Sequence, residues 1–341
     1  MKKIFLLIAF IFLLTACKKN DVSDVIKKFS DDVSKTTSYH LVGNMDIIGD
    51  EEEFNYTFDV KYLKDDLYKV SLYNKNNNHE QIILKNKDGV YVITPELNKS
   101  FKFQSSWPNN SSQSYLLASL LKDINNDDNV KLKSDKATYT ITALVNYPNN
   151  NELVKEDIIF DKDINIKKVI VYDNNNNKRI ICTFNKVDLK ANNSIDEFKL
   201  DEYIKKSSDI SDTSKCDSSD CDKKAANLID DIIYPLYLPN NTYLTSSEKI
   251  GDGDRVILTF NGDKDFTIIE ETALVSDDFE IKPVYGDPVM LNDVIGVMGD
   301  NSVRWFRGGI NYYLTSGSLT SDEMATIASS MNHAISVLGS K

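Results

Sequence analysis

The chain has 341 residues, of which 41% are hydrophobic and 10% aromatic, so it has enough apolar side chains to form buried cores. This length exceeds that of one ordinary domain and predicts two. It has 52 acidic against 40 basic residues, a formal net charge of −12, and no basic stripe stands out. This acidic balance argues against nucleic-acid binding, and against a membrane contact in which a broad basic surface lies on anionic lipid.

The N-terminus has the pattern of a secretory signal peptide, predicted at residues 1–16. Two lysines precede an uncharged apolar run, which as a helix rises only about 20 Å, too short to span a bilayer. The run ends in Leu14-Thr-Ala-Cys17, which resembles a bacterial lipobox, whose cysteine sulfur takes a diacylglycerol. The resemblance implies lipidation at Cys17, a tether at 17–21 and an extracytoplasmic protein anchored to the cell membrane. The alternatives are an ordinary signal peptide with an incidental cysteine, or a buried helix.

After the tether, the spacing of apolar residues from Val22 to Val33 predicts an amphipathic helix. From residue 37 the period changes to two, and asparagine-rich runs separate short strands as hairpin tips. The pattern predicts an antiparallel meander interrupted by a very apolar helix at 115–124, which we expect to be buried against the sheet. The predicted strands span 39–47, 54–62, 67–73, 80–85, 89–93, 100–104, 137–145, 153–160, 166–172 and 178–187.

Two segments of this meander have a more specific pattern: Asp88-Gly-Val-Tyr-Val-Ile-Thr-Pro95 and Asn98-Lys-Ser-Phe-Lys-Phe103. Together with the order of helix and strands, they resemble the LolA-like superfamily of lipoprotein carriers, which includes the N-terminal domain of RseB-type regulators. The continuation from Ser106-Trp-Pro108 to Leu117 resembles Gram-positive sporulation and germination lipoproteins. This resemblance implies an α+β fold over residues 22–200, a curved, half-open antiparallel β-sheet with helices plugging its mouth.

The same resemblance implies an apolar cavity for an acyl chain or an apolar peptide. Its candidate lining consists of aromatic and leucine side chains from the strands and the internal helix. Each of them also suits an ordinary core between sheet and helix. The candidates are Phe54, Phe58, Tyr91, Phe101, Phe103, Trp107, Leu117 and Leu121.

A polar segment at 201–224 is predicted to be a linker to a smaller α+β domain at 225–341. Cys216 and Cys221 lie in this linker and are candidates for a small-loop disulfide, whereas Cys182 lies in an apolar run and is expected to be buried. The final domain is predicted to contain strands, a hairpin at Gly308-Gly309, and a last helix that opens with the capping box Thr320-Ser-Asp-Glu323. It resembles a small domain found on Gram-positive lipoproteins.

No catalytic, metal-binding or cofactor motif stands out. The three histidines have no serine, cysteine or histidine partner at motif spacing, so we expect a non-catalytic protein without cofactor or metal. The first hypothesis is a lipoprotein that binds an apolar ligand in its concave sheet. The alternative is an RseB-like regulator or scaffold that binds an envelope or spore-cortex protein, and a cell-wall hydrolase is a remote third.

Overall fold

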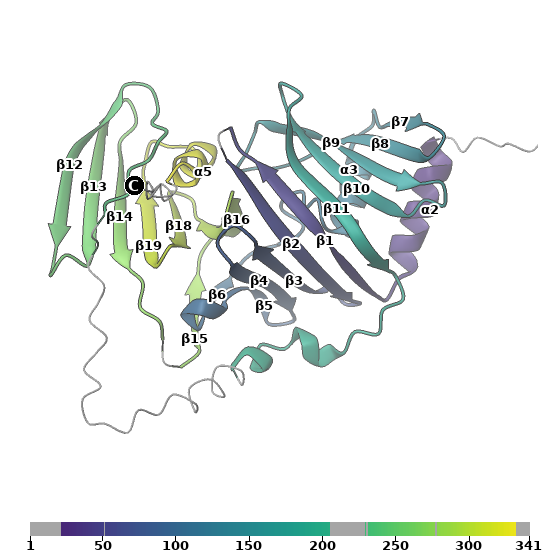
Figure 1. Cartoon of the computed structure of the whole chain (residues 1–341), viewed down its shortest axis with the longest axis horizontal. Coiled ribbons are helices and arrows are strands. Elements are labelled where there is room, and N and C mark those ends of the chain that lie inside the picture. The colour runs from purple at the N-terminus through teal and green to yellow at the C-terminus, as the bar shows by residue number, and fades with distance from the viewer. Residues whose placement is uncertain (1–21, 51, 205–228, 230, 277, 332–341) are drawn as a thin grey trace, which may run out of the picture.

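The structure, a computed structural model, describes residues 22–50, 52–204, 229, 231–276 and 278–331. These residues form two β-sheets that lie side by side, each with helix packed on it (Figure 1). No helix in these ranges combines the length and apolar character that a bilayer span requires. Cys17, Cys216 and Cys221 lie outside the described ranges, so the predictions of lipidation and of a disulfide stay predictions.

The first sheet has twelve strands in the order β15-β6-β5-β4-β3-β2-β1-β11-β10-β9-β8-β7, so it is open and does not close into a barrel. All of its neighbours pair antiparallel except β15 and β6, which are parallel. Its strands are β1 (Ser38–Ile48), β2 (Glu53–Leu63), β3 (Leu67–Asn74), β4 (His79–Asn86), β5 (Gly89–Thr94), β6 (Lys99–Phe103), β7 (Lys131–Ser134), β8 (Thr138–Leu144), β9 (Leu153–Asp161), β10 (Ile166–Asp173), β11 (Lys178–Asp188) and β15 (Glu280–Val284). The predicted open antiparallel sheet of an α+β fold is confirmed.

Local sequence explains these strands. Buried and half-buried positions alternate along β2, so one face packs inward, as the period of two predicts. The hairpin tips contain asparagines in the left-handed backbone region, with φ of 61° at Asn78 and 65° at Asn176. Asparagine tolerates this region better than most residues because its short side chain can hydrogen-bond locally.

Helices α2 (Val22–Lys35) and α3 (Leu117–Asn126) pack on the same face of this sheet, and their apolar side chains join its main core (Figure 1). Phe29 of α2 meets Phe160 of β9 edge-on, with ring centroids 5.1 Å apart. Phe58, from β2, is fully buried against Gly43 of β1, where any side chain would strike the phenyl ring. The internal helix is therefore buried against the sheet, as its apolar sequence predicted.

The opposite face of β3, β4 and β5 is covered by the 3-10 helix η3 (Ile195–Phe198) and the residues after it. Phe198 and Tyr203 form a separate core cluster there with Tyr91 of β5. A second short 3-10 helix, η2 (Pro95–Leu97), joins β5 to β6. The first sheet thus has apolar contacts on both of its faces.

The second sheet has seven strands in the order β12-β13-β14-β19-β18-β17-β16 and carries helix α5 (Ser321–Ser329). The predicted capping box is present: the Thr320 hydroxyl accepts from the Glu323 N–H, and the Glu323 carboxylate accepts from the Thr320 N–H. The hairpin at Gly308-Gly309 is also present. The strands are β12 (Thr242–Ile250), β13 (Arg255–Gly262), β14 (Phe266–Thr272), β16 (Asp287–Leu291), β17 (Val294–Met298), β18 (Ser302–Arg307) and β19 (Ile310–Thr315).

Strand β15 differs from the sequence-based division of the chain. It belongs to the C-terminal half but extends the first sheet, pairing Glu280 to Val284 with Lys99 to Phe103. The chain therefore adds a strand to the edge of the first sheet before it forms the remaining strands of the second. Strands β7, β15, β16 and β17 were not predicted from the sequence.

Candidate functional site

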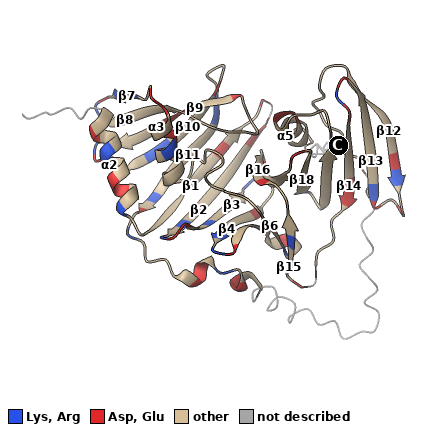
Figure 2. Ribbon diagram, turned by 180° about the vertical axis from the view of Figure 1, so that it is seen from behind, with Lys and Arg blue, Asp and Glu red and all other residues tan. Residues whose placement is uncertain are grey.

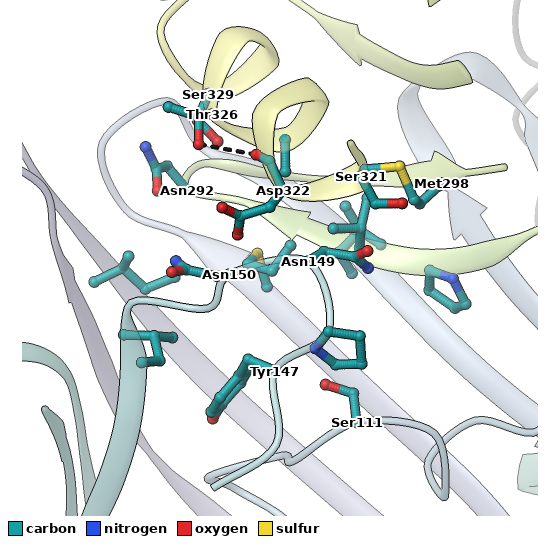
Figure 3. Close-up of a pocket in the computed structure, with 18 of the residues that line it drawn as sticks. Ser111, Tyr147, Asn149, Asn150, Asn292, Met298, Ser321, Asp322, Thr326 and Ser329 are labelled. Atoms are coloured by element: carbon teal, nitrogen blue, oxygen red, sulfur yellow. Dashed lines mark hydrogen bonds between the residues drawn. The ribbon is translucent and has the colours of Figure 1, made fainter. Parts of the chain in front are cut away.

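A cleft of about 830 Å³ lies between the two sheets and is a candidate binding site (Figure 3). Its walls come from the β1–β2 loop, the loop after β6, the loop between β8 and β9, the start of β11, the β16–β17 hairpin and α5. The volume falls within the range of roughly 300–1,000 Å³ that is typical of small-ligand sites.

One side of the cleft is fixed where the β16–β17 hairpin docks on the first sheet. The two-residue turn Asn292-Asp293 puts Asn292 at φ 57°, a conformation that asparagine favours in tight hairpins. Three side chains of the first sheet bond the backbone of this hairpin. The Tyr56 hydroxyl donates to the Asn292 carbonyl at 2.8 Å, the Asn74 amide to the Asp293 carbonyl at 3.2 Å, and the Gln81 amide to the Ile295 carbonyl at 3.1 Å.

A buried ion pair supports the same turn from the side of the second sheet. Arg307 Nε lies 2.9 Å from Asp293 Oδ2, and the two side chains are only 5% and 9% exposed. The Arg307 guanidinium also donates to the carbonyls of Ala328 and Met331 at the end of α5. Arg307 thus joins the docked turn and the cleft-lining helix into one unit.

On the other side of the cleft, the loop between β8 and β9 is bonded to α5. The Asn151 N–H donates to Asp322 Oδ1 at 2.8 Å. In Figure 3 the Asp322 side chain points from α5 toward the loop that carries Asn149 and Asn150. Thr326 holds this turn of α5 by donating to the Asp322 carbonyl at 2.9 Å.

The floor of the cleft is apolar. It is formed by buried side chains of both sheets, while Leu236 stands at the rim with 77% of its surface exposed. The floor residues are Phe54, Ile83, Trp107, Ile295 and Met298. Because these floor side chains are only 2–8% exposed, an occupant would bury apolar surface chiefly at exposed lining residues such as Leu236 and Tyr237, with a gain of about 25 cal/mol per Å².

The charged lining is strongly acidic. Its one cation in the part of the chain that the structure describes is Arg179, whose Nε is 2.9 Å from Asp173 and whose Nη1 is 2.6 Å from Asp50. These bonds raise the pKa of Arg179, the bond to Asp50 contributing most. The acidic lining residues are Asp50, Glu52, Glu152, Asp287, Asp300 and Asp322.

Beneath the cleft, Tyr147 reaches toward buried acids of the first core. Burial and the neighbouring Glu156 carboxyl raise the pKa of Tyr147 well above its ordinary value. Glu156 of β9 is fully buried, and neither of its carboxyl oxygens has a hydrogen-bond partner among the described residues. Burial, and then the charge of Asp123, raise the pKa of Glu156 well above its ordinary value. Burial also raises the pKa of Asp123 to about 6.

Comparison with known proteins places this architecture in a family. No protein-family profile matches the sequence. The chain is 34% identical over 324 residues to the sporulation protein YdcC of Bacillus subtilis, covering 94% of this chain and 93% of YdcC. The chain belongs to the YdcC family.

Solved structures are similar to this YdcC-family chain at much lower identity. MucB is 12% identical, with a TM-score of 0.35, and the match covers 91% of this chain and 98% of MucB. A LolA superfamily protein from Nitrosomonas europaea is 10% identical, with a TM-score of 0.31, covering 54% of this chain and all of that protein. At these identities the likeness concerns the fold alone.

The structure places the predicted ligand-binding residues of this YdcC-family protein in three locations. Phe54 and Trp107 line the cleft, and Tyr91 lies on the opposite face of the sheet, in the cluster with Phe198. Phe54 and Trp107 also belong to the main core under α2 and α3, and the remaining five belong to it or pack against it: Phe58, Phe101, Phe103, Leu117 and Leu121.

Sequence reasoning missed most of the cleft. Asn150, Asn292 and Asp322 are far apart in the chain and belong to no motif of known function. Only Leu236 had a local signal: it lies in the extended segment between Pro235 and Pro239, where an exposed leucine has no core to join. Cys182 is buried as predicted, and burial raises the pKa of its thiol to about 12.

Proposed function

We propose that this YdcC-family protein is a lipid-anchored, extracytoplasmic, non-catalytic scaffold of sporulating cells that holds a segment of a partner protein in the cleft between its sheets. The supporting observation is the construction of the cleft. It has an apolar floor and a polar, acidic rim, and hydrogen bonds from both sheets fix its width. Such a site suits a polypeptide, whose side chains bury apolar area while its backbone bonds the rim.

An acyl chain is the competing ligand, and it was expected on the face of the sheet that carries α2 and α3. Side chains already fill that face: Phe58, Leu117 and Leu120 are fully buried or nearly so. The acidic rim of the cleft also disfavours the anionic head of a fatty acid or phospholipid, because like charges repel. These two features support the scaffold over the carrier.

In-cell photocross-linking tests the scaffold proposal. A photoreactive amino acid replaces Leu236 at the cleft rim in the full-length, anchored protein of sporulating cells. The control places it at Tyr243 of β12, which is 60% exposed at the edge of the second sheet farthest from β16. We expect a discrete protein adduct at 236 that is absent at 243. Adducts of equal yield at both positions, or none at 236, would overturn the proposal.

Native mass spectrometry of the purified protein tests the carrier directly. A scaffold gives the bare polypeptide mass once the anchor's own lipid is accounted for. The acyl-chain carrier would be favoured instead by a further mass that is removed by organic extraction and identified as lipid, together with the absence of a protein adduct at 236.

A further inference from the structure

The charge of the cleft specifies which kind of polypeptide segment fits it. Among the described residues, six carboxylates and one arginine line the cleft, and no lysine or histidine does. The whole chain has 52 acidic and 40 basic residues, so the excess of acid in the cleft is far beyond that of the composition. Arg179 does not neutralise the remaining carboxylates of the cleft, because its guanidinium is bonded to Asp50 and Asp173.

The carboxylates come from segments that are distant in sequence, and the fold brings them together. Asp50 follows β1, Glu152 precedes β9, Asp287 begins β16 and Asp322 lies in the first turn of α5. Acidic positions on β16 and α5 are visible beside the first sheet in Figure 2. Charges gathered at a hollow with low-dielectric walls produce a stronger potential than the same charges spread over a convex surface.

Two of these carboxylates are available to an occupant. Glu152 and Asp300 are exposed, and neither forms an ion pair within the described ranges. Both line the same cleft as apolar residues such as Phe54 and Ile295. A matching occupant therefore needs apolar side chains for the floor and cationic side chains for the rim.

We propose that the cleft selects a basic amphipathic segment of its protein partner, with lysine or arginine against Glu152 and Asp300 and apolar side chains on the floor. This inference rests on the proposed scaffold function and names the chemistry of its partner. Electrostatic complementarity of this kind sets specificity and speeds association, and it weakens as salt is added.

The test measures peptide binding to the full chain held in phosphatidylcholine nanodiscs. The probes are two fluorescent peptides of the same pattern, one of leucine and lysine, the other of leucine and glutamate. The cleft variant is E152K with D300K. The matched control, D128K with D163K, makes the same change in net charge at exposed acids that do not line the cleft.

We expect the lysine peptide to bind the native protein and the glutamate peptide not to bind. The cleft variant should weaken binding of the lysine peptide at least about tenfold at low salt, and the control less than about twofold. Equal effects of the two variants, or binding of the glutamate peptide, would overturn the inference.

The cross-linked partner separates this inference from the scaffold function. If the adduct at 236 maps to a basic amphipathic segment of the partner, both stand. If it maps to an acidic or uncharged segment, the inference fails and the scaffold stands. If no adduct forms, the scaffold itself fails.

Discussion

Glu156 in the first core and Asp293 beside the second show two different ways of burying a carboxyl group. In the first core, Glu156 has no hydrogen-bond partner among the described residues, and burial raises its pKa well above the ordinary value. Beside the second, Asp293 is paired with Arg307, and Glu270 accepts the Ile233 N–H at 3.1 Å. Burial thus favours the protonated form of Glu156, whereas Asp293 has a cationic partner. Glu270 combines the two features, because burial raises its pKa to about 7 although it accepts a backbone N–H.

This difference matters for the cleft, because Asp293 lies next to one side of it and Glu156 next to the other. The ion pair supports the turn that docks β16–β17 on the first sheet. Glu156 lies near Tyr147, at the start of the loop whose Asn151 bonds Asp322. We therefore expect the docked side to depend on a salt bridge and the loop side to respond to pH.

The largest effect should follow from breaking the ion pair. Arg307→Ala leaves Asp293 buried without a cation, which typically costs about 3–5 kcal/mol of unfolding free energy. Urea unfolding followed by tryptophan fluorescence measures it. The control, Arg255→Ala, breaks the exposed pair with Glu271 and should cost less than about 1 kcal/mol. Similar losses in the two variants would contradict the assigned role of Arg307.

A smaller effect, of opposite sign, should follow at Glu156. The folded state holds this proton more tightly than the unfolded chain, so stability falls as the pH rises above the ordinary glutamate pKa of 4.5. Glu156→Gln should therefore stabilise the protein by roughly 1–3 kcal/mol at pH 8 and by almost nothing at pH 4. Urea unfolding across this pH range measures the difference. An Asp163→Asn control should match the native protein throughout, and a Glu156→Gln curve parallel to the native one would refute this account.

The smallest effect concerns the bond that closes the loop side of the cleft. Asp322→Ala removes the acceptor for the Asn151 N–H and should cost about 1 kcal/mol. Hydrogen exchange should become faster in the loop from Tyr147 to Glu152 and stay unchanged at the docked turn. Asp322→Asn keeps an acceptor oxygen and should largely restore protection. Equal exchange in all three proteins would show that the bond does not hold the loop.

Elements with a strong local signal could be predicted from the sequence. The period of two along β2, the apolar sequence of α3 and the capping box of α5 each follow from contacts within a few residues. Strands β16 and β17 carried little signal because each has only five residues, and buried positions run along all of β17. The parallel pairing of β15 with β6 joins segments about 180 residues apart, which no local pattern indicates.

The face on which a side chain lies was harder to predict. Five consecutive residues of β5 are buried because the sheet is covered on both sides, so its sequence shows no alternation. Tyr91 therefore could not be assigned to a face from its neighbours, and the structure puts it opposite α3. Phe54 and Trp107 were candidates as aromatic residues near the sheet, and they do line the cleft.

The sequence by itself determined the alternating strands, the buried helix and the capped last helix, because each depends on side-chain periodicity or on hydrogen bonds between near neighbours. Only the tertiary structure decided the cleft. Its acidic rim contains residues from Asp50 to Asp322. These residues come together when the β16–β17 hairpin docks on Tyr56, Asn74 and Gln81. Those contacts span more than 200 positions of the chain, a distance over which local propensity has no influence.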